Sequence, residues 1–148
     1  MSDEEKLSET EIFFSALADK TRLRLLNLMR DGEICVCFFV DVLREGQPKV
    51  SRHLAYLRNA GIVETRRNGK LIYYKIAAPK NDLTKSVLRE TLASLALHEK
   101  MRGEYEKLLR VCGESDISVE TDYAPSSKTS VNTNMNARQN RELETFLL

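Results

Sequence analysis

Long apolar runs are missing from this 148-residue sequence. A conventional transmembrane helix needs about 18 or more consecutive apolar residues, and no stretch approaches that length. The acidic start of the chain, residues 1–6, also lacks the basic region followed by an apolar stretch that defines a secretory signal. We therefore expect a cytoplasmic protein that makes no contact with a membrane.

Cysteine and histidine are scarce, with three and two copies respectively. An odd number of cysteines, two of them nearly adjacent, argues against a disulfide framework and favours reduced thiols. The sequence also contains no glycine-rich phosphate loop, no nucleophile elbow and no paired catalytic carboxylates. Nothing in it indicates an enzyme, and no permanent cofactor is expected.

Charge is distributed unevenly along the chain, although the formal total is only +1. Residues 44–80 carry nine basic and two acidic side chains, a local balance of +7, which is the pattern of a polyanion-binding segment. Residues 113–148 carry three basic and six acidic side chains and are rich in Ser, Thr and Asn. This composition favours a domain at 1–112 followed by a disordered polar tail at 113–148.

Periodicity predicts several helices and one hairpin. Apolar residues recur at helical spacing over 8–18, with a capping-box pattern at Ser8, and over 20–30, with Asp19 as the cap. A short helix at 37–44 and a second at 47–60, with Pro48 in its first turn, come next. Strands at 62–66 and 71–76 flank an Asn-Gly pair that favours a primed turn. Residues 82–110 then read as one long amphipathic helix, which is a natural dimer surface.

This order of elements predicts a mainly α fold with a β-hairpin wing, the winged helix-turn-helix, dimerising through its terminal helices. In such folds the second helix of the motif enters the major groove of DNA. On a regular helix over 47–60, Val50, Leu54 and Leu57 share an inward face. The opposite face and the wing hold the residues that we expect to bind DNA: Gln47, Lys49, Ser51, Arg52, His53, Tyr56, Arg66, Arg67 and Lys70.

The run Gln47-Pro48-Lys49-Val50-Ser51-Arg52-His53-Leu54, with the patterns at 57–63 and 67–74, resembles the ArsR/SmtB family of bacterial metal-responsive repressors over residues 8–110. The segment Glu33-Ile34-Cys35-Val36-Cys37 is similar to the arsenic-site motif of the family's arsenic-responsive branch. The resemblance implies a homodimer that binds an operator containing an imperfect inverted repeat. It also implies release when As(III) or Sb(III) binds the thiolates, and control of arsenic efflux or detoxification genes.

The thiol motif departs from the family pattern at one position. A third cysteine of the motif is replaced by Val40, so arsenite remains the expected inducer while a methylated or aryl arsenical becomes more plausible. Cys112 is a tentative third ligand, from the same or the partner subunit. On a regular helix, side chains two residues apart point about 200° away from each other. One ion therefore cannot bridge the sulfurs of Cys35 and Cys37 while the segment stays helical, and we expect ligand binding to unwind or prevent the first turn of the helix at 37–44.

Alternatives stay open at this point. The cysteines could sense oxidants. A Cys-x-Cys pair, however, can form only a strained disulfide with a small ring, and no neighbouring lysine or arginine lowers the pKa of either thiol. They could also bind another thiophilic ion such as Cd, Zn or Pb. The zinc site that the family builds along its dimer helix fits poorly, since His98 is the only histidine there. A dimerising protein-interaction module without DNA is disfavoured by the basic segment.

Overall fold

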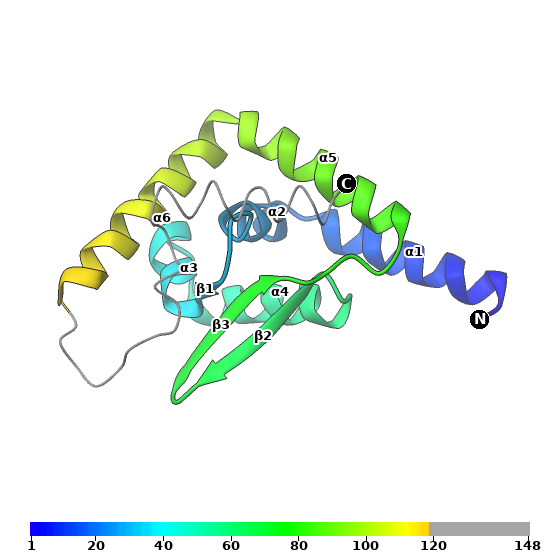
Figure 1. The fold of residues 1–148 in the computed structure, drawn as a ribbon, viewed down its shortest axis with the longest axis horizontal. Helices are drawn as coiled ribbons and strands as arrows, with labels where there is room; N and C mark the ends of the chain where they lie inside the picture. The colour runs from blue at the N-terminus through cyan, green and yellow to red at the C-terminus, as the bar shows by residue number, and fades with distance from the viewer. Residues whose placement is uncertain (119–148) are drawn as a thin grey trace.

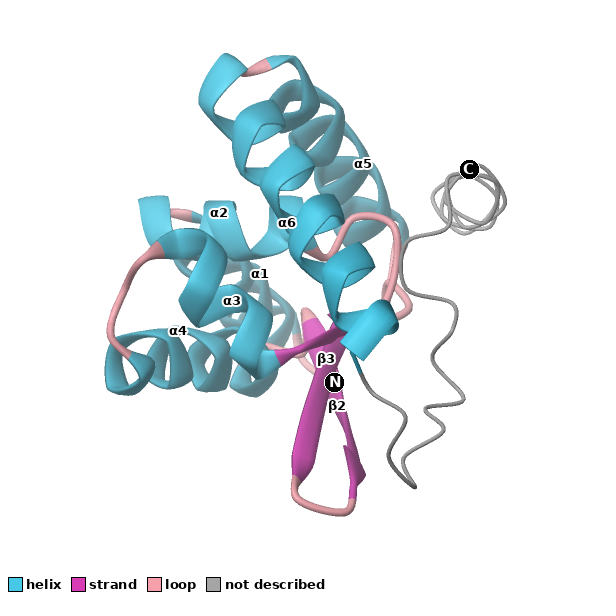
Figure 2. Ribbon diagram, turned by 90° about the vertical axis from the view of Figure 1, so that its left-hand side faces the viewer, coloured by secondary structure: helices cyan, strands magenta, loops and turns pink. Residues whose placement is uncertain are grey.

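A computed structural model describes residues 1–118 of the chain (Figure 1). The elements, in chain order, are α1 (Asp3–Leu17), α2 (Lys20–Leu28), β1 (Ile34–Cys35), α3 (Val36–Leu43), α4 (Gln47–Asn59), β2 (Val63–Asn68), β3 (Leu71–Ile76), α5 (Asp82–Leu97) and α6 (Glu99–Ser118). Helices α5 and α6 form an arch on one side of α2, while α4 and the β2–β3 hairpin lie on the opposite side (Figures 1 and 2). This is the winged helix-turn-helix expected from the sequence.

The core lies where α2, α3, α4 and α6 meet. Leu25 of α2, Phe39 of α3 and Leu108 of α6 are fully buried in it. Burial of each such side chain contributes about 1.5–3 kcal/mol of hydrophobic free energy. The core therefore holds α4 against the rest of the domain through its apolar face and leaves its polar face outside.

A tight turn joins α3 to α4 and sets the angle between them. Arg44 caps α3 in the left-handed conformation, with φ 53, which is uncommon for a residue other than glycine. Gly46 then occupies the N-cap of α4, and Pro48 lies in the first turn of that helix, as predicted. The helix-turn-helix is thus formed by α3, residues 44–46 and α4.

The wing is a three-stranded antiparallel sheet in the order β1-β3-β2. The hairpin pairs Val63 with Ile76 and Asn68 with Leu71, so Gly69 and Lys70 form its two-residue loop. Gly69 has a positive φ of 60 and Lys70 does not, which fits a primed turn with glycine in the first loop position. The hairpin was predicted, but the third strand, β1, was not. It contains Cys35, which lies opposite Tyr73 of β3.

Two predicted helix boundaries were wrong at the N-terminal and C-terminal parts of the domain. Helix α1 begins at Asp3 because Ser2 and Glu5 form the capping box, rather than at Ser8. The helix expected over 82–110 is broken at His98, whose extended backbone (φ −76, ψ 126) ends α5 and lets α6 turn towards α2 and α3. The sequence has no glycine or proline there to mark the break.

Helix α6 contributes more to the core than a pure dimer helix would. Met101, Tyr105, Leu108 and Cys112 follow each other at helical spacing and are all buried in the domain. The helix continues to Ser118, so residues 113–118, which the sequence assigned to the tail, are helical. The remainder of the predicted tail, 119–148, lies outside the described residues. Within residues 1–118, no helix has the length and apolarity that crossing a bilayer requires.

Candidate nucleic-acid interface and thiol site

One face of α4 is buried and the other is available to a ligand. Val50, Leu54 and Leu57 are each 0% exposed, as the helical spacing predicted. Most of the residues expected to bind DNA are on the opposite face, and four of them are exposed: Gln47, Ser51, Arg52 and Tyr56. Two others, Lys49 and His53, are half-buried because they contact neighbouring side chains.

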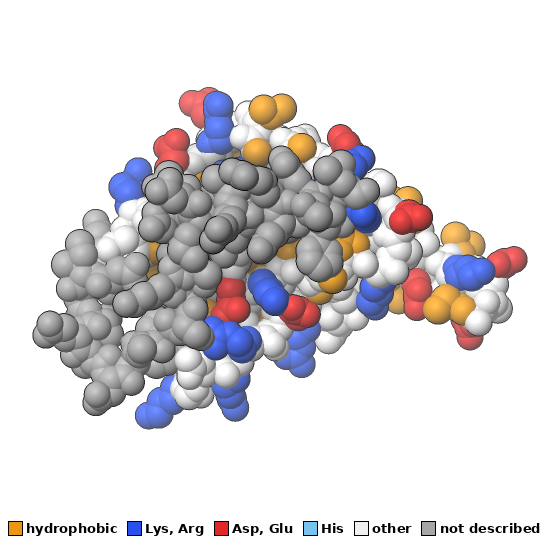
Figure 3. All heavy atoms as spheres, in the orientation of Figure 1, with side chains coloured by type: hydrophobic (Ala, Val, Ile, Leu, Met, Phe, Trp, Pro, Cys, Tyr) orange, Lys and Arg blue, Asp and Glu red, His pale blue; other side chains and the backbone are white. Residues whose placement is uncertain are grey.

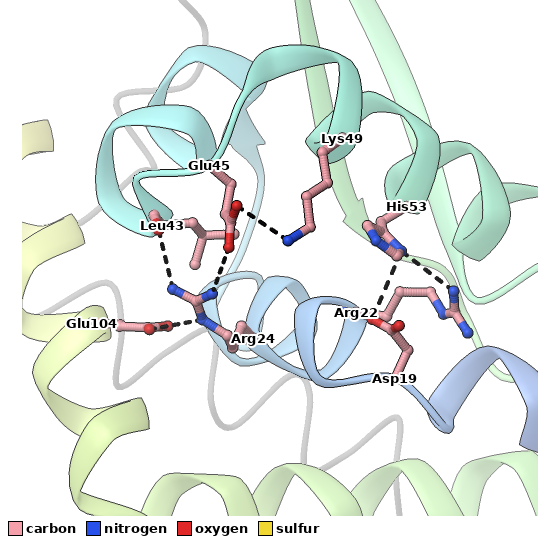
Figure 4. Close-up of polar contacts among 8 residues, drawn as sticks. All are labelled: Asp19, Arg22, Arg24, Leu43, Glu45, Lys49, His53 and Glu104. Atoms are coloured by element: carbon pink, nitrogen blue, oxygen red, sulfur yellow. Dashed lines mark hydrogen bonds and ion pairs between the residues drawn. The ribbon is translucent and has the colours of Figure 1, made fainter.

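Lys49 is held at the start of α4 by an ion pair. Its Nζ lies 3.1 Å from the carboxylate of Glu45, which also faces Arg24 of α2 at 3.6 Å (Figure 4). The hydrogen bond and charge of Lys49 lower the pKa of Glu45, so this carboxylate stays ionised at neutral pH. Arg24 in turn bonds Glu104 of α6 at 2.8 Å and the carbonyl of Leu43 at 3.1 Å. This network connects α6 to the beginning of α4.

His53 turns the Nδ1 edge of its ring towards α2. Its Nδ1 lies 3.3 Å from Nη1 of Arg22 and 3.7 Å from the carboxylate of Asp19 (Figure 4). Burial by itself raises the pKa of Asp19, but the hydrogen bond from the backbone N–H of Arg22 and the charge of its guanidinium act against burial, and the pKa is lowered. His53 is therefore positioned by α2, and its side chain has restricted freedom.

The wing carries the remaining predicted DNA contacts, and they divide into two kinds. Arg67 near the end of β2 and Lys70 in the loop are exposed at the tip of the hairpin. Arg66 lies earlier in β2 and donates two hydrogen bonds, of 2.8 and 2.5 Å, to Glu33. Its guanidinium also lies over the ring of Tyr73, 4.7 Å from the centroid. Arg66 thus connects the wing to the segment that leads into the thiol pair.

Basic side chains gather along one edge of the molecule. Figure 3 shows Lys and Arg along the lower edge, where Figure 1 places α4 and the hairpin. Acidic side chains are fewer on that edge and more common towards α1 and α5. Because duplex DNA carries a negative charge about every 1.7 Å along its axis, such an edge favours its binding.

The thiols of Cys35 and Cys37 face each other, with 3.2 Å between the sulfur atoms. Cys35 is the N-cap of α3 and has an extended backbone (φ −69, ψ 141), while Cys37 is in the first turn. The expectation that the two side chains diverge on a helix is therefore wrong, because the helix begins after Cys35. For metal–sulfur bonds of about 2.3 Å meeting near a right angle, two sulfurs lie about 3.3 Å apart. The pair can chelate one ion without unwinding α3.

The two thiols differ in acidity because they share one proton. The Cys37 thiol donates to Cys35, and the backbone N–H groups of Cys37 and Val36 add to this, which together lower the pKa of Cys35 to about 6 against the opposing effect of burial. The same hydrogen bond, burial and the negative charge of Cys35 raise the pKa of Cys37. Near neutral pH the pair is therefore one thiolate and one thiol. The sequence did not indicate the lowered pKa of Cys35, because no lysine or arginine flanks it and the cause is the neighbouring thiol.

Among the described residues of this subunit, no third protein ligand joins the pair. Val40 lies one turn after Cys37, as the sequence indicated, and Cys112 is buried on α6 within the core. Across residues 1–118, no group of three or more His, Cys, Asp or Glu side chains is placed to hold a metal ion. Cys37 is exposed, whereas Cys35 is only 3% exposed, so an incoming ligand reaches the pair from the Cys37 side.

The comparisons with known proteins agree with this fold. The sequence model described as "Bacterial regulatory protein, arsR family" matches residues 19–65. The chain is 52% identical over 66 residues to the arsenic resistance transcriptional regulator ArsR1 of Pseudomonas putida, covering 44% of this chain and 52% of that protein. It is 40% identical over 80 residues to ArsR2 of the same organism, covering 53% of this chain and 70% of that regulator.

The aligned segment spans about half the length of ArsR1 and of the arsenical resistance operon repressor of Escherichia coli, which is 45% identical over 65 residues, 43% of this chain. Among solved structures, a homodimeric winged helix-turn-helix domain, Mb0332 of Mycobacterium bovis, is 27% identical with a TM-score of 0.54, over 66% of this chain and 92% of that one. Reduced HlyU of Vibrio cholerae has the same identity and TM-score, over 64% and 96%. The chain belongs to the arsR family of bacterial regulatory proteins.

Proposed function

We propose that this regulator is a homodimeric repressor that leaves its operator when As(III), Sb(III) or an organoarsenical binds Cys35 and Cys37. The observation that carries the proposal is the 3.2 Å separation of the two sulfurs at the N-terminus of α3. Soft thiolate ligands select thiophilic ions, and a lowered pKa makes the thiolate available near neutral pH. The arsenic-resistance regulators among its relatives support arsenic as the inducer.

Operator recognition is assigned to α4 and to the tip of the wing. Gln47, Ser51 and Arg52 are exposed on α4 and have the hydrogen-bonding groups that read base edges, while Lys49, Arg67 and Lys70 suit phosphate. Two copies of α4 about 34 Å apart would match an imperfect inverted repeat.

Dimerisation is assigned to the terminal helices. Large apolar side chains remain exposed on α1, at Ile12 and Phe14, and on α5, at Leu83 and Leu97. Exposed apolar surface of this kind is typical of an interface. The homodimeric neighbour from M. bovis supports the same assembly. Helix α6 is better placed to support α2 and α3 than to form the outer surface of the dimer.

The route from the thiols to DNA runs through the wing. Cys35 belongs to β1, which pairs with β3, and Glu33 of the preceding segment binds Arg66 of β2. Coordination replaces the hydrogen bond between the two thiols with bonds to the ligand. A shift of the Cys35 backbone that accompanies this exchange also moves the hairpin that carries Arg67 and Lys70. By thermodynamic linkage, the operator must weaken inducer binding by the same factor.

The pair offers only two protein sulfurs, which bears on the choice of inducer. Formation of each As–S bond replaces one hydroxide on arsenic, and the thiol proton leaves with it as water. Two such exchanges leave the third position of arsenite to a hydroxide, and that of methylarsenite to its methyl group. Since Val40 supplies no donor, the site suits a methylated or aryl arsenical as well as arsenite.

A thiol-redox repressor is the second candidate, and the lowered pKa of Cys35 favours it. The test is to titrate the protein–operator complex in parallel with arsenite, antimonite, methylarsenite, zinc, cadmium and peroxide. We expect release by the arsenicals and antimonite at concentrations well below those of the other agents. Release by peroxide alone would support the redox candidate, and release by cadmium or zinc alone would replace arsenic with another thiophilic ion.

A further inference from the structure

Arg22 of α2 is anchored to the end of α1 by two hydrogen bonds. Its Nε donates to the carbonyl of Ala16 at 2.7 Å, and its Nη2 donates to the carbonyl of Ser15 at 3.0 Å. These carbonyls belong to the last turn of α1, where the helical hydrogen-bond pattern ends, and the Ser15 carbonyl also accepts a bond of 3.3 Å from the N–H of Ala18. The planar guanidinium is therefore fixed in orientation by backbone on one side.

The other side of the same guanidinium contacts two side chains of α4. Its Nη1 lies 3.3 Å from Nδ1 of His53, and its central carbon lies 4.0 Å from the centroid of the Tyr56 ring. His53 and Tyr56 are three residues apart, so they are neighbours on one face of α4. Figure 4 shows the Arg22 and His53 side chains meeting between α2 and α4.

This geometry determines which ring nitrogen of His53 accepts a hydrogen bond. A guanidinium has N–H donors and no acceptor, so Nδ1 of His53 must accept from it. A neutral imidazole that accepts at Nδ1 carries its hydrogen on Nε2 and donates from there. Asp19, at 3.7 Å, is beyond hydrogen-bond distance and already accepts from the Arg22 backbone at 3.0 Å.

We propose that Arg22 is a positioning residue for operator recognition. It holds His53 as an Nε2–H donor, keeps the Tyr56 ring against its guanidinium, and fixes both relative to the end of α1. The contacts of Arg22 with α1 make the position of these side chains depend on the helix assigned to dimerisation. The proposal rests on the assignment of α4 to operator reading, so the test must separate the two.

The test measures dissociation constants of the full chain for the operator and for a random duplex, at several salt concentrations. The variants are Arg22→Gln, Arg22→Lys and the control Lys20→Gln, which removes a charge from an exposed residue of the same helix. We expect Arg22→Gln to weaken operator binding about tenfold, with random-duplex affinity and salt slope unchanged. Arg22→Lys keeps the charge but not the fork of donors, so we expect a similar loss. Lys20→Gln should leave the preference for the operator intact.

Several outcomes overturn the proposal. A salt slope shallower by about 0.9 in Arg22→Gln means that Arg22 itself binds phosphate. Equal losses on both duplexes mean a structural role only, and unchanged affinity means no role. If circular dichroism shows that Arg22→Gln does not fold, the dissociation constants and salt slopes of Arg22→Lys are used to test the proposal in the same way.

A mutant cycle identifies the groups through which Arg22 acts. In a His53→Ala, Tyr56→Leu background, Arg22→Gln should change operator affinity by less than about twofold, because its targets are gone. A full tenfold loss there contradicts positioning. If the background variant itself binds the operator as tightly as the native protein while Arg52→Ala also has no effect, the assignment of α4 fails instead.

Discussion

The acidity of Cys35 is a direct chemical consequence of the geometry of the thiol pair, and it can be measured without DNA. With a pKa of about 6, about 90% of Cys35 is thiolate at pH 7, whereas an ordinary thiol with a pKa of about 8.5 is only about 3% thiolate. Removing the Cys37 hydrogen bond takes away the largest cause of the lowered pKa. In Cys37→Ala the pKa of Cys35 should therefore rise by about two units or more towards the ordinary value.

The assay is the pH dependence of alkylation by iodoacetamide, followed by mass spectrometry of the peptide that contains residues 35 and 37. Cys37→Ala gives the profile of Cys35 alone, while Cys37→Ser keeps a hydroxyl that can donate to the thiolate. We expect midpoints near pH 6 in the native protein, intermediate in Cys37→Ser and highest in Cys37→Ala. Since only the thiolate reacts, each midpoint reports the pKa of Cys35 directly.

Two results would refute this reasoning. A native midpoint near pH 8.5 would show that the sulfurs do not share a proton as their 3.2 Å separation implies. An equally low midpoint in Cys37→Ala would assign the acidity to the N-terminus of α3 alone. Denatured protein is the control for each variant, because unfolding abolishes both causes and should restore an ordinary profile.

Three further predictions concern the operator and the inducer. Arg52→Ala should weaken operator binding by about 1–3 kcal/mol in a fluorescence anisotropy titration, as expected for one base contact; unchanged affinity would remove α4 from recognition. Glu33→Gln breaks a half-exposed ion pair with Arg66 worth about 0.5–1 kcal/mol. The inducer should therefore shift operator affinity about two- to fivefold less in this variant than in the native protein. An undiminished shift would exclude the wing as the route from the thiols to DNA. Val40→Cys should tighten binding of arsenite more than binding of methylarsenite in a competition assay, and equal gains would count against a site limited to two sulfurs.

The parts of the fold that depend on local patterning could be predicted from the sequence. Val50, Leu54 and Leu57 follow helical spacing, and Asn68-Gly69 marks the hairpin because glycine there permits a positive φ. The break at His98 could not be predicted in this way, since α5 and α6 are both apolar at helical spacing and the break depends on how α6 packs against α2 and α3.

The candidate site, like the fold, could be predicted from the sequence only in part. Cys35 and Cys37 are recognisable by their spacing, but their mutual orientation depends on where α3 begins, and that follows from the pairing of β1 with β3. The partners that restrain the reading residues, Arg22 for His53 and Glu33 for Arg66, are 31 and 33 residues away in sequence. Such contacts arise from tertiary packing and have no local signature.

The central claim, that the thiol pair senses the inducer and controls the operator complex, is tested most directly by arsenite titration of the complex in the native protein and in Cys35→Ser, Cys37→Ser. The native complex should dissociate as arsenite is added. The double variant should bind the operator with comparable affinity and remain bound throughout the same titration. Normal release from the double variant would contradict the account, because the ligand would then act at another site.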